Sequence, residues 1–507
     1  MTITELQQQY AVHPNVTAMN RLLKDVSVKH IFCGGLCASS ASLFFSVLVR
    51  KETCPFVFIL SDLEEAGYFY HDLTQVLGGE RILFFPSSFR RAIKYGQKDA
   101  ANEILRTEVL SRLQKGEKGL CVVTYPDALA EKVVSRKELS DKTLKLGVGE
   151  RVDSTFVTDV LHSYGFEYVD YVYEPGQYAV RGSIIDVFSF SSEYPYRIDF
   201  FGDEVESIRT FEVDSQLSRE KKDSIVIVPD LAVTGMASTS FLDFIPRDAV
   251  LAMRDFLWLR ERIQSVHDEA LTPQAIAVQE AEENGGITLE GKLIDGSEFT
   301  VHALDFRRLE FGNKPTGTAD ATVSFDVTAQ PIFHKNFDLA AASFQEYQEK
   351  GYSLYICSDS TKQTDRIRAI FEDRGDKISF IAVERTLHEG FADNELRLCV
   401  FTDHQLFDRF HKYNLKSDKA RSGKVALSLK ELNQFTPGDY VVHTDHGVGR
   451  FSGLVRIPNG DTTQEVMKLV YQNDDVVFVS IHSLHKVSKY KGKEGEPPRL
   501  NKLGTGA

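Results

Sequence analysis

Alternating apolar and polar residues mark two neighbouring strands that stand out from the rest of the chain. Residues 181–188, Arg-Gly-Ser-Ile-Ile-Asp-Val-Phe, and residues 196–204, Tyr-Arg-Ile-Asp-Phe-Phe-Gly-Asp-Glu, each alternate as strands with one buried face do. The polar link 189–195 predicts an antiparallel pair. Alternation places Phe200 and Phe201 on opposite faces, so one is exposed unless a partner covers it. Exposed arginine beside an exposed ring is typical of a protein-binding hot spot; the alternative is an ordinary solvated face.

The first 137 residues alternate short apolar runs with helical patterns. This alternation predicts an α/β layer with a mainly parallel sheet. The expected strands are 29–33, 56–60, 82–85 and 119–124, and the expected helices are 39–50, 62–77 and 100–115.

The glycine turn after the first of these strands is where a phosphate-binding loop would lie. Such a loop has the pattern G-x-x-x-x-G-K-[ST], with a lysine for charge and a hydroxyl for magnesium. In register from Gly34, this chain has Ser39 for the second glycine, Ser40 for the lysine and Ala41 for the hydroxyl residue. We therefore predict that the nucleotide site is lost. The alternative is weak binding of an anion by the backbone at the helix N-terminus.

A basic run with aromatic residues follows the third strand, at 89–98 (Phe-Arg-Arg-Ala-Ile-Lys-Tyr-Gly-Gln-Lys). Such a run can contact nucleic acid by phosphate pairing and stacking. We favour the simpler interpretation, a solvated loop that leads into the next helix.

Further along, the pattern changes several times. Residues 138–228 predict a small α+β insert with one helix at 153–164 and a strand at 168–173 among its three or four strands. The next segment has helical patterns at 256–268 and 272–284 and a glycine-broken region at 285–292. We predict that it packs back on the first α/β layer, which is then discontinuous. The predicted units are 1–137 and 229–335 for that layer, 138–228 for the insert, 336–428 for a further small α/β domain and linker, and 429–507 for a small twisted sheet or barrel.

Two histidines and an aspartate lie close together in the last unit. His443, Asp445 and His446 are ligand types that zinc uses. Adjacent strand residues point apart, and no further ligand cluster follows. We therefore predict turn and packing residues, and no metal site.

Composition and charge narrow the functional classes. A chain of 507 residues is too long for one core. Its formal net charge of −14 argues against a protein whose main task is to grip nucleic acid through phosphates. The six cysteines show no zinc-type spacing, and Cys33 and Cys37, which have no second pair or histidines nearby, are interpreted as buried thiols in a reducing compartment. No apolar run spans a membrane and no signal peptide pattern is present, so we predict a cytoplasmic location.

Two long motifs make the chain resemble the N-terminal half of the bacterial transcription-repair coupling factors. Residues 181–188 and 196–204 are very similar to the patterns R-G-x-x-x-[DE]-[ILV]-F and R-[ILV]-[DE]-F-F-G-D-E that this family shares with UvrB. Residues 438–451 resemble the start of its RNA-polymerase-interacting domain, which is CarD-like and Tudor-like. Residues 387–391 resemble the domain between them, so the resemblance spans essentially the whole chain.

The resemblance implies a multidomain α/β protein. It would contain a degenerate UvrB/helicase-like α/β domain with an α+β insert, a further small α/β domain and a C-terminal CarD/Tudor-like small β-barrel. The implied partners are UvrA and the RNA polymerase β subunit, with DNA bound mainly by a C-terminal translocase. The chain stops where the family continues into that translocase, so we expect a fragment without cofactors, ATP and magnesium belonging to the missing part.

The resemblance also assigns residues to UvrA binding. Carried over by position, Arg181, Arg197 and Phe201 are the expected contacts, with Arg209 next. Arginine suits bidentate pairing with carboxylates on a partner, and phenylalanine can fill a pocket at the centre of an interface. The expected result is that replacing Arg181 and Arg197 by alanine abolishes UvrA binding and leaves the melting temperature unchanged.

For polymerase binding, the expected mode is pairing through an edge strand. The strand 465–470 is the candidate, with Val466 and Lys468 on one face and Met467 and Leu469 on the other. Which face docks stays open at this point. An arginine at position 469 should break polymerase binding if that face is used, whereas unfolding of the domain would show that Leu469 is core.

Two functions are consistent with these sequence features. The first is a non-catalytic adaptor between stalled RNA polymerase and nucleotide excision repair. The rival is a UvrB-like ATPase or DNA-damage-binding protein. Ser40 and Ala41 in the degenerate loop, the acidic balance and the short segment 86–103, which lacks a long aromatic hairpin, favour the adaptor. Saturable ATP turnover by this chain would favour the rival.

Overall fold

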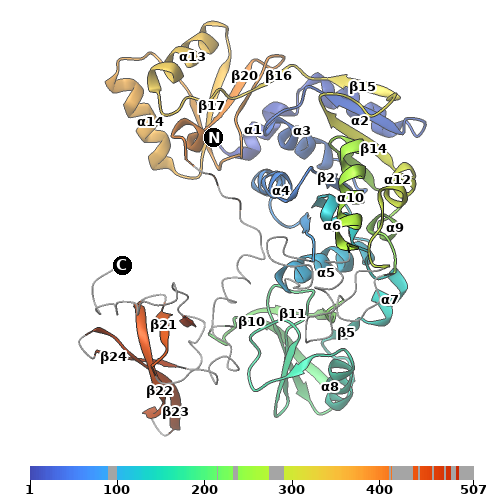
Figure 1. Ribbon diagram of the computed structural model, residues 1–507, viewed down its shortest axis with the longest axis vertical. Helices are drawn as coiled ribbons and strands as arrows, with labels where there is room; N and C mark the ends of the chain where they lie inside the picture. The colour runs from blue at the N-terminus through green and yellow to red at the C-terminus, as the bar shows by residue number, and fades with distance from the viewer. Residues whose placement is uncertain are drawn as a thin grey trace. The chain divides into compact units, whose positions relative to one another are not determined.

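The computed structural model of the chain is drawn in Figure 1. The basic run 89–98 and most of the expected helix 272–284 lie outside the residues it describes. The chain divides into two compact units, 1–143 with 230–415 and 144–229 with 416–507. The described residues are 1–88, 100–213, 215–231, 238–272, 291–409, 411, 413, 438–443, 446–459, 462–472, 475–480 and 487–489.

The first unit is built on a parallel seven-stranded sheet with the order β15-β1-β14-β13-β2-β4-β3. Its strands are short and mostly apolar, as expected of strands that are buried on both faces. Strands from both sides of the segment 144–229 share this sheet, because β14 and β13 lie between β1 and β2. The strands are β1 (His30–Gly34), β2 (Phe56–Ile59), β3 (Ile82–Phe85), β4 (Cys121–Thr124), β13 (Val250–Met253), β14 (Arg307–Gly312) and β15 (Ala321–Ser324).

Helices flank this sheet in the chain order that an α/β layer requires. Helix α3 is apolar on all sides and buried along its whole length. Helix α4 begins at Asp62, whose carboxylate caps the first turn by accepting from the N–H of Glu65. The helices are α1 (Ile3–Tyr10), α2 (Pro14–Lys24), α3 (Ser40–Val49), α4 (Leu63–Leu77), α5 (Ala100–Gln114), α6 (Pro126–Ala130), α7 (Arg136–Asp141), α9 (Phe241–Phe244), α10 (Phe256–Ala270) and α12 (Gly296–Leu304).

The same unit contains a second, five-stranded sheet with the order β16-β19-β20-β17-β18. Its first strand begins at Val327, so the predicted boundary after residue 335 is too late. The strand is three residues long, and its pairing with β19 is a distant contact that the local pattern does not signal. The elements are β16 (Val327–Ala329), α13 (Phe337–Glu349), β17 (Ser353–Ser358), α14 (Thr361–Asp373), β18 (Ile381–Glu384), β19 (Phe391–Asp393), β20 (Leu398–Thr402) and α15 (Asp403–Leu406).

Residues 144–229 form a six-stranded sheet with the order β11-β10-β9-β8-β7-β6, and a separate two-stranded pair, β12-β5. The sheet has more strands than expected, and the predicted strand 168–173 is reduced to two residues. The elements are β5 (Leu144–Gly147), α8 (Ser154–Ser163), β6 (Glu167–Tyr168), β7 (Gln177–Arg181), β8 (Ile184–Val187), β9 (Tyr196–Phe201), β10 (Glu204–Phe211), β11 (Ser218–Lys222) and β12 (Ser224–Ile227).

The C-terminal segment forms an antiparallel five-stranded sheet with the order β24-β23-β22-β21-β25. Its core gathers the inward residues of successive strands, among them Val441, Phe451 and Leu469. The strands are β21 (Tyr440–His443), β22 (Gly447–Asn459), β23 (Thr462–Val470), β24 (Val476–Ser480) and β25 (Val487–Lys489).

All six cysteines are free thiols; Cys33 is buried as predicted, whereas Cys37 is only partly buried. Among the helices of the described residues, none is both long and apolar enough to cross a membrane.

Candidate partner-binding surfaces

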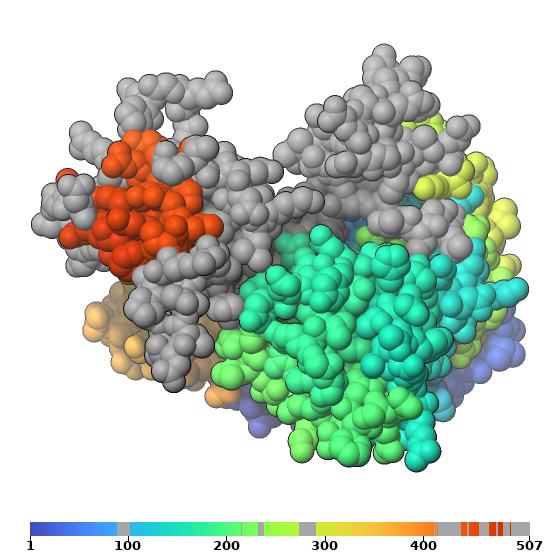
Figure 2. Space-filling view, turned by 90° about the horizontal axis from the view of Figure 1, so that it is seen from below, coloured from blue at the N-terminus to red at the C-terminus, as the bar shows by residue number. Residues whose placement is uncertain are grey.

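The register of the six-stranded sheet brings the four expected UvrA contacts to one face. Asp186 of β8 lies opposite Arg197 of β9, and Arg197 lies opposite Arg209 of β10. Directly opposite residues share a face, and so do residues two apart on one strand. We call this surface the arginine face; it consists of Arg181, Asp186, Arg197, Asp199, Phe201 and Arg209. The segment that carries it is turquoise to green in Figures 1 and 2.

The opposite face of the sheet is the core of this domain. Its strands bury Ile185, Ile198 and Phe200 against Val157 and Leu161 of α8. Helix α8 covers this face (Figure 1), whereas the face with the arginines carries a smaller buried cluster of Val172, Ala179, Phe188 and Phe211 beside the charged residues. Alternation along the strands produces this division, as the sequence predicts.

A buried carboxylate lies at the centre of the arginine face. The side chain of Asp186 is only 1% exposed and accepts hydrogen bonds from Nε and Nη2 of Arg197 at 2.8 and 2.9 Å. It also forms an ion pair with Arg181. Hydrogen bonding to this carboxylate raises the pKa of Arg197. Sequence reasoning gave Asp186 no role, although its place in the alternation puts it on the same face as the arginines.

Arg197 and Arg181 differ in how many contacts they make within the domain and in how far they are exposed. Arg197 also donates from Nη1 to the carbonyl of Gln216 at 3.1 Å, and its guanidinium lies 4.4 Å from the centre of the Phe211 ring. Its side chain is 15% exposed. Arg181 is 37% exposed, and its guanidinium lies 4.9 Å from the ring of Tyr171.

Phe201 is the apolar part of this surface. It is 78% exposed, whereas its neighbour Phe200 is 4% exposed, so the expected division between the two rings is confirmed. Phe201 lies opposite Glu204 at the end of the β9–β10 hairpin, whose turn contains Gly202 with a φ of 62°. A tight hairpin turn requires such a positive φ, which glycine adopts without strain.

Arg209 is the most loosely held of the three arginines. Its Nη2 lies 3.6 Å from Oδ2 of Asp199, and both side chains are partly exposed. Its Nε is buried and has no hydrogen-bond partner. Because this Nε is buried, a partner could reach Arg209 only through the exposed part of its side chain, which is 32% exposed.

The residues expected to bind polymerase do not lie on an edge strand. Strand β23 pairs with β22 on one side and β24 on the other, so its backbone groups are already used. Val466, Met467 and Leu469 are at most 2% exposed, and Lys468 is partly exposed. The edge-pairing role assigned to 465–470 is therefore wrong, because strand order places this strand inside the sheet.

Strand β24 is the edge strand next to it. Among the described residues it pairs only with β23. Its side chains Val476 and Phe478 are 38% and 51% exposed. An edge strand with exposed apolar side chains offers both main-chain hydrogen bonds and side-chain pockets to an added strand.

His443 and His446 lie together in the C-terminal sheet, with their ring centres 4.6 Å apart and nearly parallel. Asp445, the third residue of the predicted cluster, lies outside the described residues. In the part of the chain that the structure describes, no three side chains are arranged to hold a metal.

The degenerate phosphate loop is closed by a segment of the second sheet's domain. The N–H of Ser39, at the start of α3, donates to the carbonyl of Glu389 at 3.3 Å, and the N–H of Glu389 donates to Oγ of Ser39 at 2.9 Å. Ser40 and Ala41 are buried. A backbone donor that could bind an anion at this helix N-terminus is therefore already paired with Glu389.

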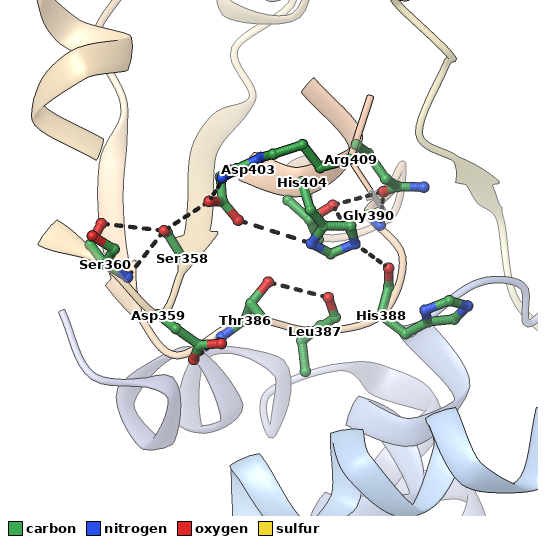
Figure 3. A network of polar contacts seen from close by, with 12 residues as sticks. Ser358, Asp359, Ser360, Thr386, Leu387, His388, Gly390, Asp403, His404 and Arg409 are labelled. Atoms are coloured by element: carbon green, nitrogen blue, oxygen red, sulfur yellow. Dashed lines mark hydrogen bonds and ion pairs between the residues drawn. The ribbon is translucent and has the colours of Figure 1, made fainter. Parts of the chain in front are cut away.

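The segment 386–390, which closes the loop, is fixed by hydrogen bonds and ion pairs. Figure 3 shows residues 386–390 beside a network of polar contacts from β17 and α15. The ring of His404 bonds to the carbonyl of His388 at 2.7 Å through Nε2. Asp403 accepts from Ser358 at 3.0 Å and from Arg409 at 2.8 Å.

A cavity of about 290 Å³ remains beside the loop, and its charge is wrong for a nucleotide. Its single arginine, Arg254, pairs with Glu65 at 2.8 Å. The remaining charged groups are mainly carboxylates, which repel phosphates. The lining residues include Asp62, Glu64, Glu65, Asp72 and Glu389.

Asp72 gives this region a measurable pH dependence. It is 3% exposed and accepts from the N–H of His388 at 2.7 Å and from Oγ of Ser42 at 2.8 Å. Burial raises the pKa of Asp72 to about 6. A raised acid pKa favours folding at low pH, and this contribution is lost as the pH rises through about 6.

Asp72→Asn is therefore expected to be more stable than the unchanged chain at pH 8, by up to about 3 kcal/mol, and equal to it near pH 4. Asparagine keeps an acceptor for His388 and removes the ionisation. Melting temperatures measured from pH 4 to 8 test this. A stability difference between Asp72→Asn and the unchanged chain that stays the same from pH 4 to pH 8 would contradict the assignment.

Two family models match segments of this chain. Residues 144–232, which contain the arginine face, match the family model described as the UvrB interaction domain. Residues 435–491, which contain the C-terminal sheet, match the CarD-like/TRCF RID domain.

Relatives align along nearly the whole chain. The chain is 23% identical over 547 residues to the transcription-repair-coupling factor of Staphylococcus aureus (strain bovine RF122 / ET3-1), an alignment that covers 93% of this chain and 46% of the relative. It is 23% identical over 554 residues to the protein of the same name from Bacillus subtilis (strain 168), covering 94% and 46%. The expected resemblance to the N-terminal half of these factors is confirmed, and the chain spans about half the length of these relatives.

Proposed function

We propose that the chain is the adaptor portion of a transcription-repair coupling factor, which connects stalled RNA polymerase to nucleotide excision repair in the bacterial cytoplasm. The observation that carries this proposal is the arginine face. It places the exposed ring of Phe201 and the partly exposed guanidiniums of Arg181 and Arg209 on one sheet face, within the segment that matches the UvrB interaction domain. Arginine and aromatic residues dominate binding energy at protein interfaces, so this face fits UvrA as its partner.

The C-terminal sheet supplies the second partner in this proposal. Its match to the CarD-like/TRCF RID domain supports the RNA polymerase β subunit as the ligand. We assign the contact to the free edge of β24, where Phe478 is half exposed, in place of β23. Main-chain pairing with a strand of the β subunit would supply affinity.

The proposal assigns no catalysis to this chain. Its degenerate phosphate loop carries Ser40 and Ala41, Glu389 closes it, and carboxylates line the adjacent cavity. ATP, magnesium and the main DNA contacts belong, in the proposal, to the translocase of the whole factor. The rival UvrB-like ATPase has no support from the geometry of this loop.

Two titrations test the adaptor role directly. Purified chain is expected to bind UvrA and, independently, a fragment of the polymerase β subunit, each with saturable heat in calorimetry. Phe201→Ala should weaken the first interaction by about tenfold and leave the second unchanged, because the two surfaces lie on different domains. Absence of binding to both proteins would refute the proposal.

A further inference from the structure

The arginine face contains a group that cannot contact a partner directly. Asp186 is buried beneath the two guanidiniums, with a side chain only 1% exposed. A buried carboxylate is costly unless it is paired and fully hydrogen-bonded. Asp186 lies beside the buried cluster of Ala179, Phe188 and Phe211, so its two arginines neutralise it there and are themselves fixed by it.

The two arginines are held by this carboxylate in different ways. Arg197 binds it through two N–H groups, donates a third bond to Gln216 and lies over Phe211, so its donors point into the domain. Arg181 forms one bond to Asp186 and keeps the larger exposed fraction. Arg181 carries five N–H donors, as every guanidinium does, and one bond leaves most of them for a partner.

We infer that Asp186 and Arg197 are positioning residues that fix Arg181 for a carboxylate of the partner, beside an apolar pocket that takes Phe201. This inference rests on the proposed function and deepens it. The carboxylate anchors one edge of the Arg181 guanidinium, and Tyr171 supports its flat side. A guanidinium fixed before binding loses less rotamer entropy when its other edge forms a bidentate pair.

Three residues of the arginine face have different roles in this arrangement. Arg181 makes the contact, Arg197 completes the anchor, and Asp186 orients both. The partner chemistry follows from the groups that remain free, namely an acidic side chain for Arg181 and an apolar recess for Phe201, which is 78% exposed. A partner surface with basic residues at this position is excluded by charge.

The test compares affinities for purified UvrA in calorimetric titrations of the full chain. Asp186→Asn is expected to weaken binding by about tenfold, because Arg181 loses its anchor. Asp159→Asn is the control: this exposed carboxylate lies on α8, which packs on the opposite face of the sheet, so the expected change is less than about twofold.

A double-mutant cycle distinguishes positioning from a merely structural role. In the Arg181→Ala background, Asp186→Asn should weaken binding by less than about twofold further, since its effect passes through Arg181. An equal additional loss in both backgrounds would overturn the inference.

A second variant distinguishes loss of the Arg181 anchor from unfolding of the domain. Asp186→Ala combined with Arg197→Met replaces the buried pair by apolar side chains, which commonly preserves stability. This variant should retain the melting temperature and lose as much affinity as Asp186→Asn. Full affinity in it would overturn the inference alone, whereas failure of the unchanged chain to bind UvrA would overturn the proposed function.

Discussion

Replacing Arg181 and Arg197 together by alanine is expected to destabilise the 144–229 domain by roughly 3–5 kcal/mol as well as to abolish UvrA binding. The motif alone suggests that the melting temperature would not change. The structure predicts a different result, because the double variant leaves Asp186 buried with neither of its cations. An uncompensated buried charge costs far more than a lost surface pair.

Three variants separate the two effects of this change. Adding Asp186→Ala to the double variant removes the orphaned charge, so most of the lost stability should return while UvrA binding stays absent. Arg209→Ala, whose partner Asp199 is partly exposed, should change stability by no more than about 1 kcal/mol. Denaturant unfolding measured beside calorimetric binding reports both quantities. Unchanged stability of the double variant would show that the Asp186 pairs do not form in solution.

Leu469→Arg is expected to unfold the C-terminal sheet and to abolish polymerase binding only as a consequence. Leu469 is fully buried and packs with Val441, Phe451 and Tyr471. Removal of a buried leucine side chain typically costs about 2–5 kcal/mol, and an unpaired guanidinium adds a desolvation penalty. Circular dichroism and limited proteolysis of the variant should show loss of the folded sheet.

A selective loss of polymerase binding is expected instead from the edge strand. The N–H of Tyr471 donates to the carbonyl of Asp475, so Val477 lies in a hydrogen-bonded pair with Leu469 and the N–H of Phe478 points away from β23. Phe478→Pro should therefore remove a donor from the free edge while the sheet stays folded.

Val477→Pro is the matched control for this variant, because it breaks a bond inside the sheet. It should lower the melting temperature, which Phe478→Pro should leave nearly unchanged. Wild-type affinity of Phe478→Pro for a β-subunit fragment would exclude the β24 edge as the docking site.

Much of the local structure could be predicted from the sequence, because periodicity depends on near neighbours. The strands at 56–60 and 82–85 follow from short apolar runs, and the opposite orientations of Phe200 and Phe201 follow from alternation. The substitutions in the phosphate loop also follow from spacing. These features need no knowledge of which strands become neighbours.

The rest depends on contacts between distant residues. Strand order decides that β23 is internal and β24 is the edge, and the local pattern of both strands is alike. The closure of the phosphate loop by Glu389 joins positions 350 residues apart. The role of Asp186 could not be predicted for a related reason. Alternation along β8 gives the face on which Asp186 lies, but its burial depends on Arg197 of the next strand.

The order of strands in the first sheet has a consequence for synthesis of the chain. Strands β1 and β2 are separated in the sheet by β14 and β13, which are made much later. At about 5–20 residues per second, the interval from the end of β4 to the end of β14 lasts roughly 10–40 s. During this interval β1 and β2 therefore lack the strands that lie between them in the finished sheet.

The segment 144–229 has no such delay, because all strands of its sheet come from one continuous stretch, and β5 pairs with β12 to close its two ends. We expect it to fold on the nascent chain before the α/β layer into which it is inserted. The arginine face would then form early in translation. At that time the unpaired strands of the seven-stranded sheet would still need chaperones to protect them from aggregation.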